Sequence, residues 1–313
     1  MILFSTKDNP VPEGAEAGSI TTPDGVALRF ARWRPEEATR GTVCVFPGRT
    51  EKIEKYFETV RDLIKRGFAV AVLDWRGQGG SQRMLRNPMK GHVDDFADYG
   101  TDLDSFMREA VLPCCPAPFF ALAHSMGASV LLDSARAGER LFDRMLLLAP
   151  MLELSLLKHD LAARRLARVL RGLGLSKLYV PTGKIKPLTE IHFDGNRLTS
   201  DPVRFARNLT ITLEQPQLDV GPPTIGWMAS AFDLMELFED PATARAIRQP
   251  MLIVAGGGDR IVSTPAIERF ARRLIAGSHV VIPGARHELL QERDIFREPV
   301  FAAFDAFIPG SRV

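Results

Sequence analysis

The chain has few of the residues that mark disulfide-rich, nucleic-acid-binding or membrane-spanning proteins. Its 313 residues include 3 cysteines, and Cys114 and Cys115 are adjacent, so they cannot readily bridge to each other. This usage is typical of a reducing compartment, in which cysteines serve as small apolar residues. The formal net charge is +2 and no basic-aromatic cluster is evident, so we expect no nucleic-acid partner.

Long apolar runs are also scarce. The longest, residues 145–157, is interrupted by Pro150 and Glu153 and is too short to span a bilayer. The N-terminus turns polar after Phe4, unlike the apolar core of a secretory signal peptide. No group of histidine, cysteine or acidic residues has metal-ligand spacing. We therefore expect a cytoplasmic protein that uses no metal and no other cofactor.

The chain does contain enough apolar residues for a large core, at 45% hydrophobic. In its first half, short apolar runs typical of strands alternate with segments of helical periodicity. Several runs are apolar throughout, as expected for parallel strands that helices cover on both faces. The expected strands are 19–22, 27–34, 42–46, 68–73, 118–123 and 144–149, and the expected helices are 51–66, 93–112 and 127–136.

This alternation stops at Pro150 and resumes near residue 250. The residues between are rich in helix formers, proline and glycine, and they contain no apolar strand of the earlier kind. We therefore predict an α/β core formed by residues 1–150 and 241–313, with a mostly parallel sheet flanked by helices. A helical cap, residues 151–240, is inserted after the sixth main strand. The later elements expected are strands 250–255 and 278–282 and helices 264–276 and 294–307.

Ser125 stands where a predicted strand passes directly into a helix, in the stretch Ala123-His124-Ser125-Met126-Gly127. Small residues two positions to either side permit the tight turn that lifts a nucleophilic serine clear of a sheet. The usual pattern is Gly-x-Ser-x-Gly, and Ala123 replaces its first glycine. The alternative is a turn of small residues without chemistry. The strand-to-helix context favours Ser125 as a nucleophile.

A serine nucleophile needs a base and an acid that orients the base. His287 follows the last predicted strand, and Asp259 ends strand 250–255 in a glycine turn. The order serine, aspartate, histidine is typical of α/β-hydrolases. The alternatives are a surface histidine and a helix-capping aspartate, although Ser263 or Thr264 could cap that helix. We predict a catalytic triad of Ser125, Asp259 and His287.

Acyl transfer also needs N–H donors for the developing oxyanion. Met126 follows the nucleophile at a helix N-terminus, where its N–H has no helical partner. The second donor should lie in the loop after strand 42–46, where Pro47 has no N–H and Gly48 permits an unusual backbone. We therefore predict the backbone N–H groups of Arg49 and Met126 as the oxyanion hole. The alternative for the loop is a simple turn.

The sequence as a whole resembles the bacterial lysophospholipase L2 and monoacylglycerol lipase-like hydrolases, which are sometimes grouped with serine aminopeptidases. Many relatives carry His-Gly at the oxyanion loop, whereas Pro-Gly-Arg, as here, resembles the lysophospholipase L2 branch. The loop 74–83 we interpret as structural, with glycine turns and an Asp–Arg pair that brace neighbouring loops. The matching stretches are PGRTEKIEKY (47–56), DWRGQGGSQR (74–83), GHVDDFADYGTDLDSF (91–106), AHSMGA (123–128), AGGGDRIV (255–262) and IPGARHELLQE (282–292).

The resemblance implies the α/β-hydrolase fold and a serine hydrolase that cleaves the carboxylic ester of a single-chain lipid, in the manner of a lysophospholipase. Three alternatives stay open: a monoacylglycerol lipase, a general carboxylesterase or aminopeptidase, and a catalytically silent binding protein on the same scaffold. The expected partner is a small lipid or ester. The candidate residues for an apolar acyl slot are Leu154, Leu157, Phe193, Trp227, Met228 and Phe232.

Basic residues are concentrated in the predicted cap. If residues 159–173 are helical, leucines and valine share one face, and Arg164, Arg168 and Arg171 lie on the other. This pattern fits a lid that contacts an anionic or lipid surface, which leaves open a peripheral contact with the inner membrane. It equally fits a helix packed on the hydrolase body with its arginines in solvent. The basic segment and Arg49 could also attract a phosphate.

Overall fold

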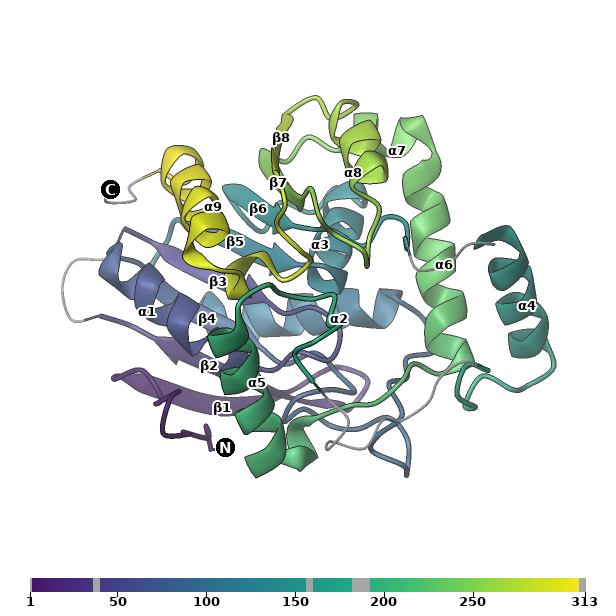
Figure 1. Cartoon of the computed structure of the whole chain (residues 1–313), viewed down its shortest axis with the longest axis horizontal. Helices are drawn as coiled ribbons and strands as arrows, with labels where there is room; N and C mark the ends of the chain where they lie inside the picture. The colour runs from purple at the N-terminus through teal and green to yellow at the C-terminus, as the bar shows by residue number, and fades with distance from the viewer. Residues whose placement is uncertain (1, 36–39, 156–159, 182–191, 310–313) are drawn as a thin grey trace.

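One twisted sheet organises the part of the chain that the computed structural model describes, residues 2–35, 40–155, 160–181 and 192–309 (Figure 1). Its eight strands lie in the order β1-β2-β4-β3-β5-β6-β7-β8, and every pair from β4 to β8 is parallel. The strands are β1 (Ala15–Thr21), β2 (Ala27–Trp33), β3 (Thr42–Phe46), β4 (Ala69–Leu73), β5 (Phe119–His124), β6 (Arg144–Leu148), β7 (Met251–Gly256) and β8 (Gly277–Ile282).

Helices cover both faces of this sheet. Figure 1 shows α1 (Phe57–Lys65) and α9 (Asp294–Phe307) over one face, and α2 (Ala97–Ser105) and α3 (Met126–Arg136) over the other. Strands β3, β4 and β7 are buried along their whole length, which explains why their sequences are apolar throughout. The predicted α/β fold with a mostly parallel sheet is confirmed. The remaining helices here are α7 (Pro241–Ala246), α8 (Thr264–Ala271) and the 3₁₀ turn η5 (Leu289–Gln291).

The helix expected over 264–276 ends at Ala271, and the strand expected over 19–22 begins earlier, at Ala15. Two further helix predictions differ from the structure at their ends. The helix expected over 51–66 begins as a 3₁₀ turn, η1 (Ile53–Tyr56), and becomes α-helical only at Phe57. The helix expected over 93–112 begins at Ala97 and continues into a π-helical segment, η2 (Phe106–Val111). Apolar periodicity extends beyond the regular helix in both cases, because buried turns flanking a helix also need apolar residues.

Between β6 and α7, the described residues contribute α4 (Asp160–Gly172), α5 (Pro202–Glu214), the 3₁₀ turn η4 (Pro216–Leu218) and α6 (Ile225–Glu239), and no strand of the sheet. Helix α5 begins where Asp201 accepts the N–H groups of Val203 and Arg204. That residues 151–240 act as a cap remains a prediction. None of the helices in the described ranges is long and apolar enough to cross a membrane.

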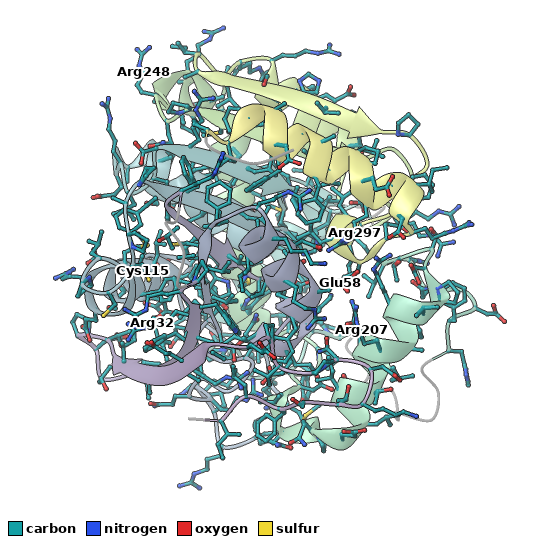
Figure 2. All side chains as sticks on the ribbon, turned by 90° about the vertical axis from the view of Figure 1, so that its left-hand side faces the viewer. Arg32, Glu58, Cys115, Arg207, Arg248 and Arg297 are labelled. Carbon is teal, nitrogen blue, oxygen red and sulfur yellow. The ribbon has the colours of Figure 1, made fainter. Side chains whose placement is uncertain are left out.

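A shared carboxylate fastens α5 to the core. Glu58 of α1 accepts hydrogen bonds from Arg204 at 2.6 Å and Arg207 at 2.6 Å, both on α5, and Arg297 of α9 lies 3.8 Å away (Figure 2). Burial opposes ionisation, but the arginines lower the pKa of Glu58 to about 2. This carboxylate is therefore charged at neutral pH and holds the three helices together.

Helix α4 packs on α6 with the side that carries its arginines, which also includes the buried Ala167. Arg168 and Arg171 bind Asp233 of α6 at 2.9 and 2.8 Å, and Arg164 binds Glu239. The helix thus packs on a neighbouring helix, as one alternative had it, and Arg168 and Arg171 remain partly exposed although they are paired with acidic residues of α6. The apolar side is left in solvent, and its exposed members are Leu161, Leu166, Val169 and Leu173.

Candidate active site

Ser125 occupies a strained turn between β5 and α3. Its φ of 49° and ψ of −112° lie in a region that side-chain-bearing residues rarely adopt. The turn brings α3 so close to β3 that a Cβ on Gly127 would lie 2.6 Å from the carbonyl oxygens of Phe46 and Pro47. Only glycine fits at 127, while Ala123 is buried in the sheet and its methyl group is accommodated.

The structure brings together the three residues predicted as a triad. His287 Nε2 lies 3.0 Å from Ser125 Oγ, and His287 Nδ1 lies 2.7 Å from Asp259 Oδ2. The other oxygen of Asp259 accepts the backbone N–H groups of Ile261 and Val262 at 2.7 and 3.1 Å. A carboxylate facing Nδ1 holds the proton there and leaves the Nε2 lone pair facing the serine hydroxyl.

Helix α8 is capped by Ser263 and not by Asp259, as the sequence analysis allowed. Ser263 accepts the N–H of Ala266, so Asp259 is not needed for capping. The loop that carries His287 also approaches β7 closely. A Cβ on Gly256 would lie 2.5 Å from the carbonyl oxygen of Ala285 and 2.6 Å from that of Arg286. This close approach brings Asp259 and His287 within hydrogen-bonding distance.

The two predicted oxyanion donors are free in the part of the chain that the structure describes. Neither the backbone N–H of Arg49 nor that of Met126 donates to another described residue. The loop carrying Arg49 is held by Trp75, whose Nε1 donates to the Pro47 carbonyl at 2.8 Å, and by Gln78, whose amide donates to the Gly48 carbonyl at 2.7 Å. Two unsatisfied N–H groups flanking a serine suit an oxyanion.

The loop after β4 braces this region, as expected, but through other partners. Asp74 binds Arg29 Nε at 2.7 Å and accepts the N–H of Ile53 at 2.9 Å. Arg29 also binds Glu54 at 2.8 Å, and all three charged side chains are at most 2% exposed. The Asp–Arg pair therefore does not lie within one loop. It joins the loop after β4 to β2 and, through Glu54, to η1, and the linear sequence does not reveal these partners.

A second histidine lies beside the first. His124 Nδ1 is 3.1 Å from the carboxylate of Glu51, and its Nε2 is 3.1 Å from the backbone carbonyl of His287. Because both ring nitrogens face acceptors, this geometry favours the doubly protonated imidazolium form of His124. Glu51 also binds Lys55 at 2.7 Å and Tyr56 at 2.5 Å.

Burial alone would lower the pKa of His124, but the charge of Glu51 raises it above the usual value of 6.5. Burial likewise opposes ionisation of Glu51, but His124 and Lys55 hold its pKa well below 4.5. The sequence analysis did not assign Glu51 or Lys55. The only available signal was their helical i,i+4 spacing, because the contact with His124 joins segments far apart in the chain.

Ser125 and His287 open into a cavity of about 310 Å³. Three of the predicted slot residues line it, namely Leu154, Trp227 and Met228, together with Met151, Leu198, Ile261 and Val262. Phe232 does not, because it lies one turn beyond Met228 on α6 and is buried under Arg164 of α4. Phe193 packs on Phe205 outside this cavity. Leu157 lies outside the described residues.

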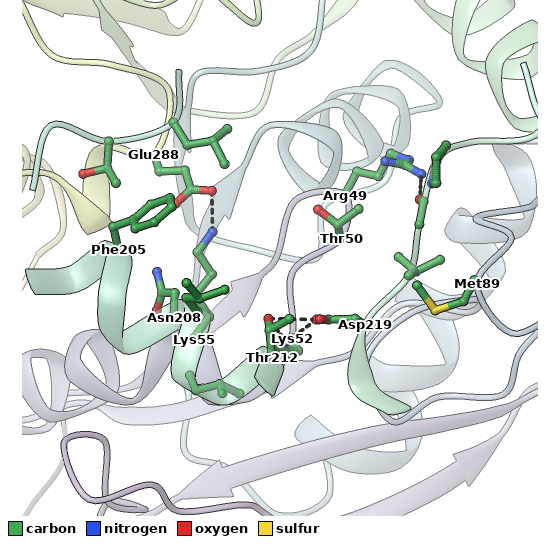
Figure 3. Close-up of a pocket in the computed structure, with 17 residues that line it drawn as sticks. Arg49, Thr50, Lys52, Lys55, Met89, Phe205, Asn208, Thr212, Asp219 and Glu288 are labelled. Carbon is green, nitrogen blue, oxygen red and sulfur yellow. Dashed lines mark hydrogen bonds and ion pairs between the residues drawn. The ribbon is translucent and has the colours of Figure 1, made fainter. Parts of the chain in front are cut away.

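A second cavity of about 430 Å³ adjoins the first (Figure 3). The two share Arg49, Thr50, Leu198 and Glu288 in their walls, and the second is also lined by residues of α5 and of the 218–222 loop. No three histidine, cysteine or acidic residues within the described ranges converge as metal ligands. The arrangement as a whole can activate a hydroxyl nucleophile next to paired N–H donors, which is the requirement of acyl transfer.

Comparisons with known proteins agree with this chemistry. The model of the family described as serine aminopeptidase, S33 matches residues 37–294. Lysophospholipase L2 of Escherichia coli K12 is 31% identical over 93% of this chain and 87% of its own length. Monoacylglycerol lipase of Mycolicibacterium smegmatis is 24% identical over 86% of this chain and 88% of its own.

Solved structures share the fold. A soluble variant of monoglyceride lipase from Saccharomyces cerevisiae, in complex with a substrate analogue, superimposes with a TM-score of 0.75 at 18% identity, covering 97% of this chain and 98% of that one. A thermostable carboxyl esterase from Bacillus coagulans, in complex with glycerol, gives 0.74 at 18% identity, covering 96% and 100%. These similarities show the α/β-hydrolase fold over nearly all of the chain.

We expect Glu51→Gln to lower the pKa of His124 and to destabilise the fold by on the order of 3 kcal/mol. A raised histidine pKa stabilises the fold fully below 6.5, and this stabilisation is lost as pH rises through the folded-state pKa. The stabilisation from the lowered carboxylate pKa is lost as pH falls below 4.5. The difference in free energy of unfolding between wild type and variant should therefore be largest between pH 4.5 and pH 6.5. Urea denaturation at a series of pH values measures this difference.

Glu288→Gln is the matched control for this experiment. This substitution also removes a carboxylate from Lys55, which lies 2.6 Å from Glu288. Glu288 itself makes no hydrogen bond to His124. The control should show a weaker dependence on pH near neutrality. If both variants follow the same pH curve, His124 is not the group whose protonation Glu51 supports.

Proposed function

The chain belongs to the serine aminopeptidase S33 family, and from this membership we propose that it is a serine hydrolase that cleaves the carboxylic ester of a single-chain lipid through an acyl-enzyme. The observation that carries the proposal is the hydrogen-bonded chain from Asp259 through His287 to Ser125, which ends at an apolar cavity. Its relatives include proteins named for lysophospholipase and monoacylglycerol lipase activity.

In the proposed acylation step, Ser125 Oγ attacks the ester carbonyl carbon while His287 Nε2 takes the hydroxyl proton. The carbonyl oxygen becomes an oxyanion that accepts the N–H groups of Arg49 and Met126. Asp259 holds the imidazole in place and stabilises its positive charge. When the intermediate collapses, the bond to the alcohol oxygen breaks, and His287 returns the proton to the departing alcohol.

In the proposed deacylation step, water attacks the acyl-enzyme and His287 takes one of its protons. The second tetrahedral intermediate uses the same N–H donors, and its collapse releases the fatty acid and restores the Ser125 hydroxyl, which regains its proton from His287. The apolar wall from Leu154, Trp227 and Met228 supports an acyl chain in this position, because such chains gain free energy on leaving water.

The carboxylates in the cavity wall are already paired, which favours an ester substrate over the N-terminus of a peptide. Recognition of a free amino terminus would need an available carboxylate near Ser125. The two carboxylates in the wall, Glu51 and Glu288, are already bound to His124 and Lys55. A catalytically silent binding protein would have no need of a serine in a strained turn, hydrogen-bonded to a histidine that a buried aspartate orients.

We further propose that the exposed apolar side of α4 rests on a lipid surface. The arginines on its other side are bound to α6, which lies between α4 and the sheet (Figure 1), and Leu161, Leu166, Val169 and Leu173 are exposed. A row of exposed aliphatic residues on one helix is unfavourable in water. Contact with an apolar surface removes this cost. A lipid hydrolase that draws its substrate from a membrane would benefit from that contact.

Ser125→Ala should abolish labelling by a fluorophosphonate probe and reduce ester turnover by about 10⁴-fold or more, because the serine oxygen is the group that the probe and the substrate acylate. Ser129→Ala is the matched control: Ser129 lies one turn along α3 and its hydroxyl binds the Met151 carbonyl at 2.9 Å. The control should remain labelled. Labelling that survives in the Ser125 variant would exclude this serine as the nucleophile.

Asp259→Asn should leave the fold intact but reduce turnover by roughly 10⁴-fold, because an amide facing Nδ1 favours the wrong tautomer and cannot stabilise the imidazolium. Turnover of a lysophospholipid, a monoacylglycerol and a short p-nitrophenyl ester would be measured, with thermal unfolding as the check on folding. A variant that is folded and fully active would show that His287 does not depend on Asp259.

Replacing Leu161, Leu166 and Leu173 by serine should weaken binding to phospholipid vesicles about tenfold or more, because each leucine loses its transfer energy into the bilayer. Turnover of a soluble short ester should not fall, since these residues are remote from Ser125. The matched control replaces three exposed aliphatic residues elsewhere, Leu112, Ile275 and Ile295, by serine. Equal loss of vesicle binding in both variants would contradict a specific role for α4.

A further inference from the structure

Arg49 has a guanidinium group that lies between the two cavities and is held there by two contacts. It lies over the indole ring of Trp227 at 5.1 Å, and its Nη2 donates to the Gly221 carbonyl at 2.6 Å. Figure 3 shows it at the upper edge of the second cavity, turned toward that carbonyl. Gly91 makes room for it, because a Cβ on Gly91 would lie 2.7 Å from Nη2.

Every other cation in the walls of these cavities has a carboxylate partner. Lys52 binds Asp219, and Lys55 binds Glu288 at 2.6 Å (Figure 3). His124 binds Glu51 at 3.1 Å. These three pairs use all the carboxylates that line either cavity in the part of the chain described. Among the described residues, the cavity walls therefore carry one positive charge without a carboxylate partner, that of Arg49.

The environment of Arg49 makes that charge costly in the absence of an anion. Its Nε is buried without a hydrogen-bond partner, and no described carboxylate lies within ion-pair distance. Burial lowers the pKa of Arg49 to about 10, so the group remains charged at neutral pH. A desolvated cation without a counterion is destabilising, and an anionic ligand would remove this penalty.

We propose that Arg49 binds the phosphate ester of the substrate's head group, so that the enzyme prefers single-chain phospholipids over uncharged monoacylglycerols. The inference rests on the proposed function, since it concerns the same site. Guanidinium groups suit phosphate oxygens in both charge and geometry. Arg49 would then be a specificity-determining residue.

The position of Arg49 in the chain strengthens this assignment. Its backbone N–H is the proposed donor to the ester oxyanion, while its side chain extends to the neighbouring cavity. In a glycerophospholipid, the three-carbon glycerol separates the acyl ester from the phosphate ester. The arginine side chain spans a comparable length between its backbone and its guanidinium group. One residue could thus contact both esters of the same molecule.

The test compares kcat/KM for a lysophosphatidylcholine and for a monoacylglycerol with the same acyl chain, both below their aggregation concentrations. The readout is the ratio of the two kcat/KM values within each variant. Every substitution at position 49 keeps the backbone N–H, so an effect common to both substrates cancels in the ratio. We expect wild type to favour the phospholipid and Arg49→Met to lower the ratio roughly 10- to 100-fold, as for loss of a charged hydrogen bond. Arg49→Lys, which keeps the charge but not the planar fork, should lie between them.

Two further variants separate this role from a general effect of charge or packing. Gly91→Ala should lower the ratio by displacing the guanidinium, and it should have no further effect in the Arg49→Met background. The double replacement Lys52→Gln with Asp219→Asn removes a cation together with its partner and should change the ratio less than twofold. A ratio that falls as far in this pair as in Arg49→Met would overturn the assignment.

Competition experiments distinguish a head group from free phosphate. Glycerophosphocholine should inhibit hydrolysis of a short p-nitrophenyl ester by wild type more strongly than by Arg49→Met, and inorganic phosphate should inhibit both weakly. If wild type hydrolyses both lipids with a ratio that Arg49→Met leaves unchanged, the inference is wrong although the proposed function stands. If wild type hydrolyses short esters but neither lipid, the proposed function itself fails.

Discussion

The strained backbone of Ser125 is the constraint on which the rest of the site depends. A φ of 49° at a residue with a side chain costs free energy, and it persists only because the surrounding packing permits no alternative. The parallel strands β3, β5 and β6 supply that packing, and Gly127 lets α3 approach the carbonyl oxygens of Phe46 and Pro47. The loop that carries Arg49 follows β3 directly, and it lines the same cavity as the serine.

Buried charges hold the elements around this turn. Asp74, Arg29 and Glu54 connect the loop after β4 to β2 and η1, and Glu51 and His124 connect the oxyanion loop to the carbonyl of His287. Each group is paired, and each pair joins segments distant in the sequence. Such pairs are costly to break singly, because the remaining partner would be left charged and buried. The site is thus kept rigid by electrostatics as well as by packing.

The sequence predicted the features that depend on local pattern. Apolar runs located the central strands, and the order of Ser125, Asp259 and His287 along those strands indicated residues that the structure brings within hydrogen-bonding distance. It could not predict the partners of Glu51 or the way α4 faces, because these depend on acids and bases that meet only after folding. The acids of α6 that bind the arginines of α4 lie more than sixty residues along the chain.

The glycines that allow close approach have a consequence for how the sequence can change over evolution. A Cβ on Gly127 or on Gly256 would lie 2.5–2.6 Å from backbone oxygens, so no other residue fits there without moving the backbone. The apolar cavity wall is different, because Trp227 and Met228 are side chains on α6, which is not part of the sheet. Substitutions on α6 can alter the shape of the cavity while leaving the turn at Ser125 untouched. The shape of this wall can therefore change in descendants of the chain that keep the turn at Ser125 unaltered.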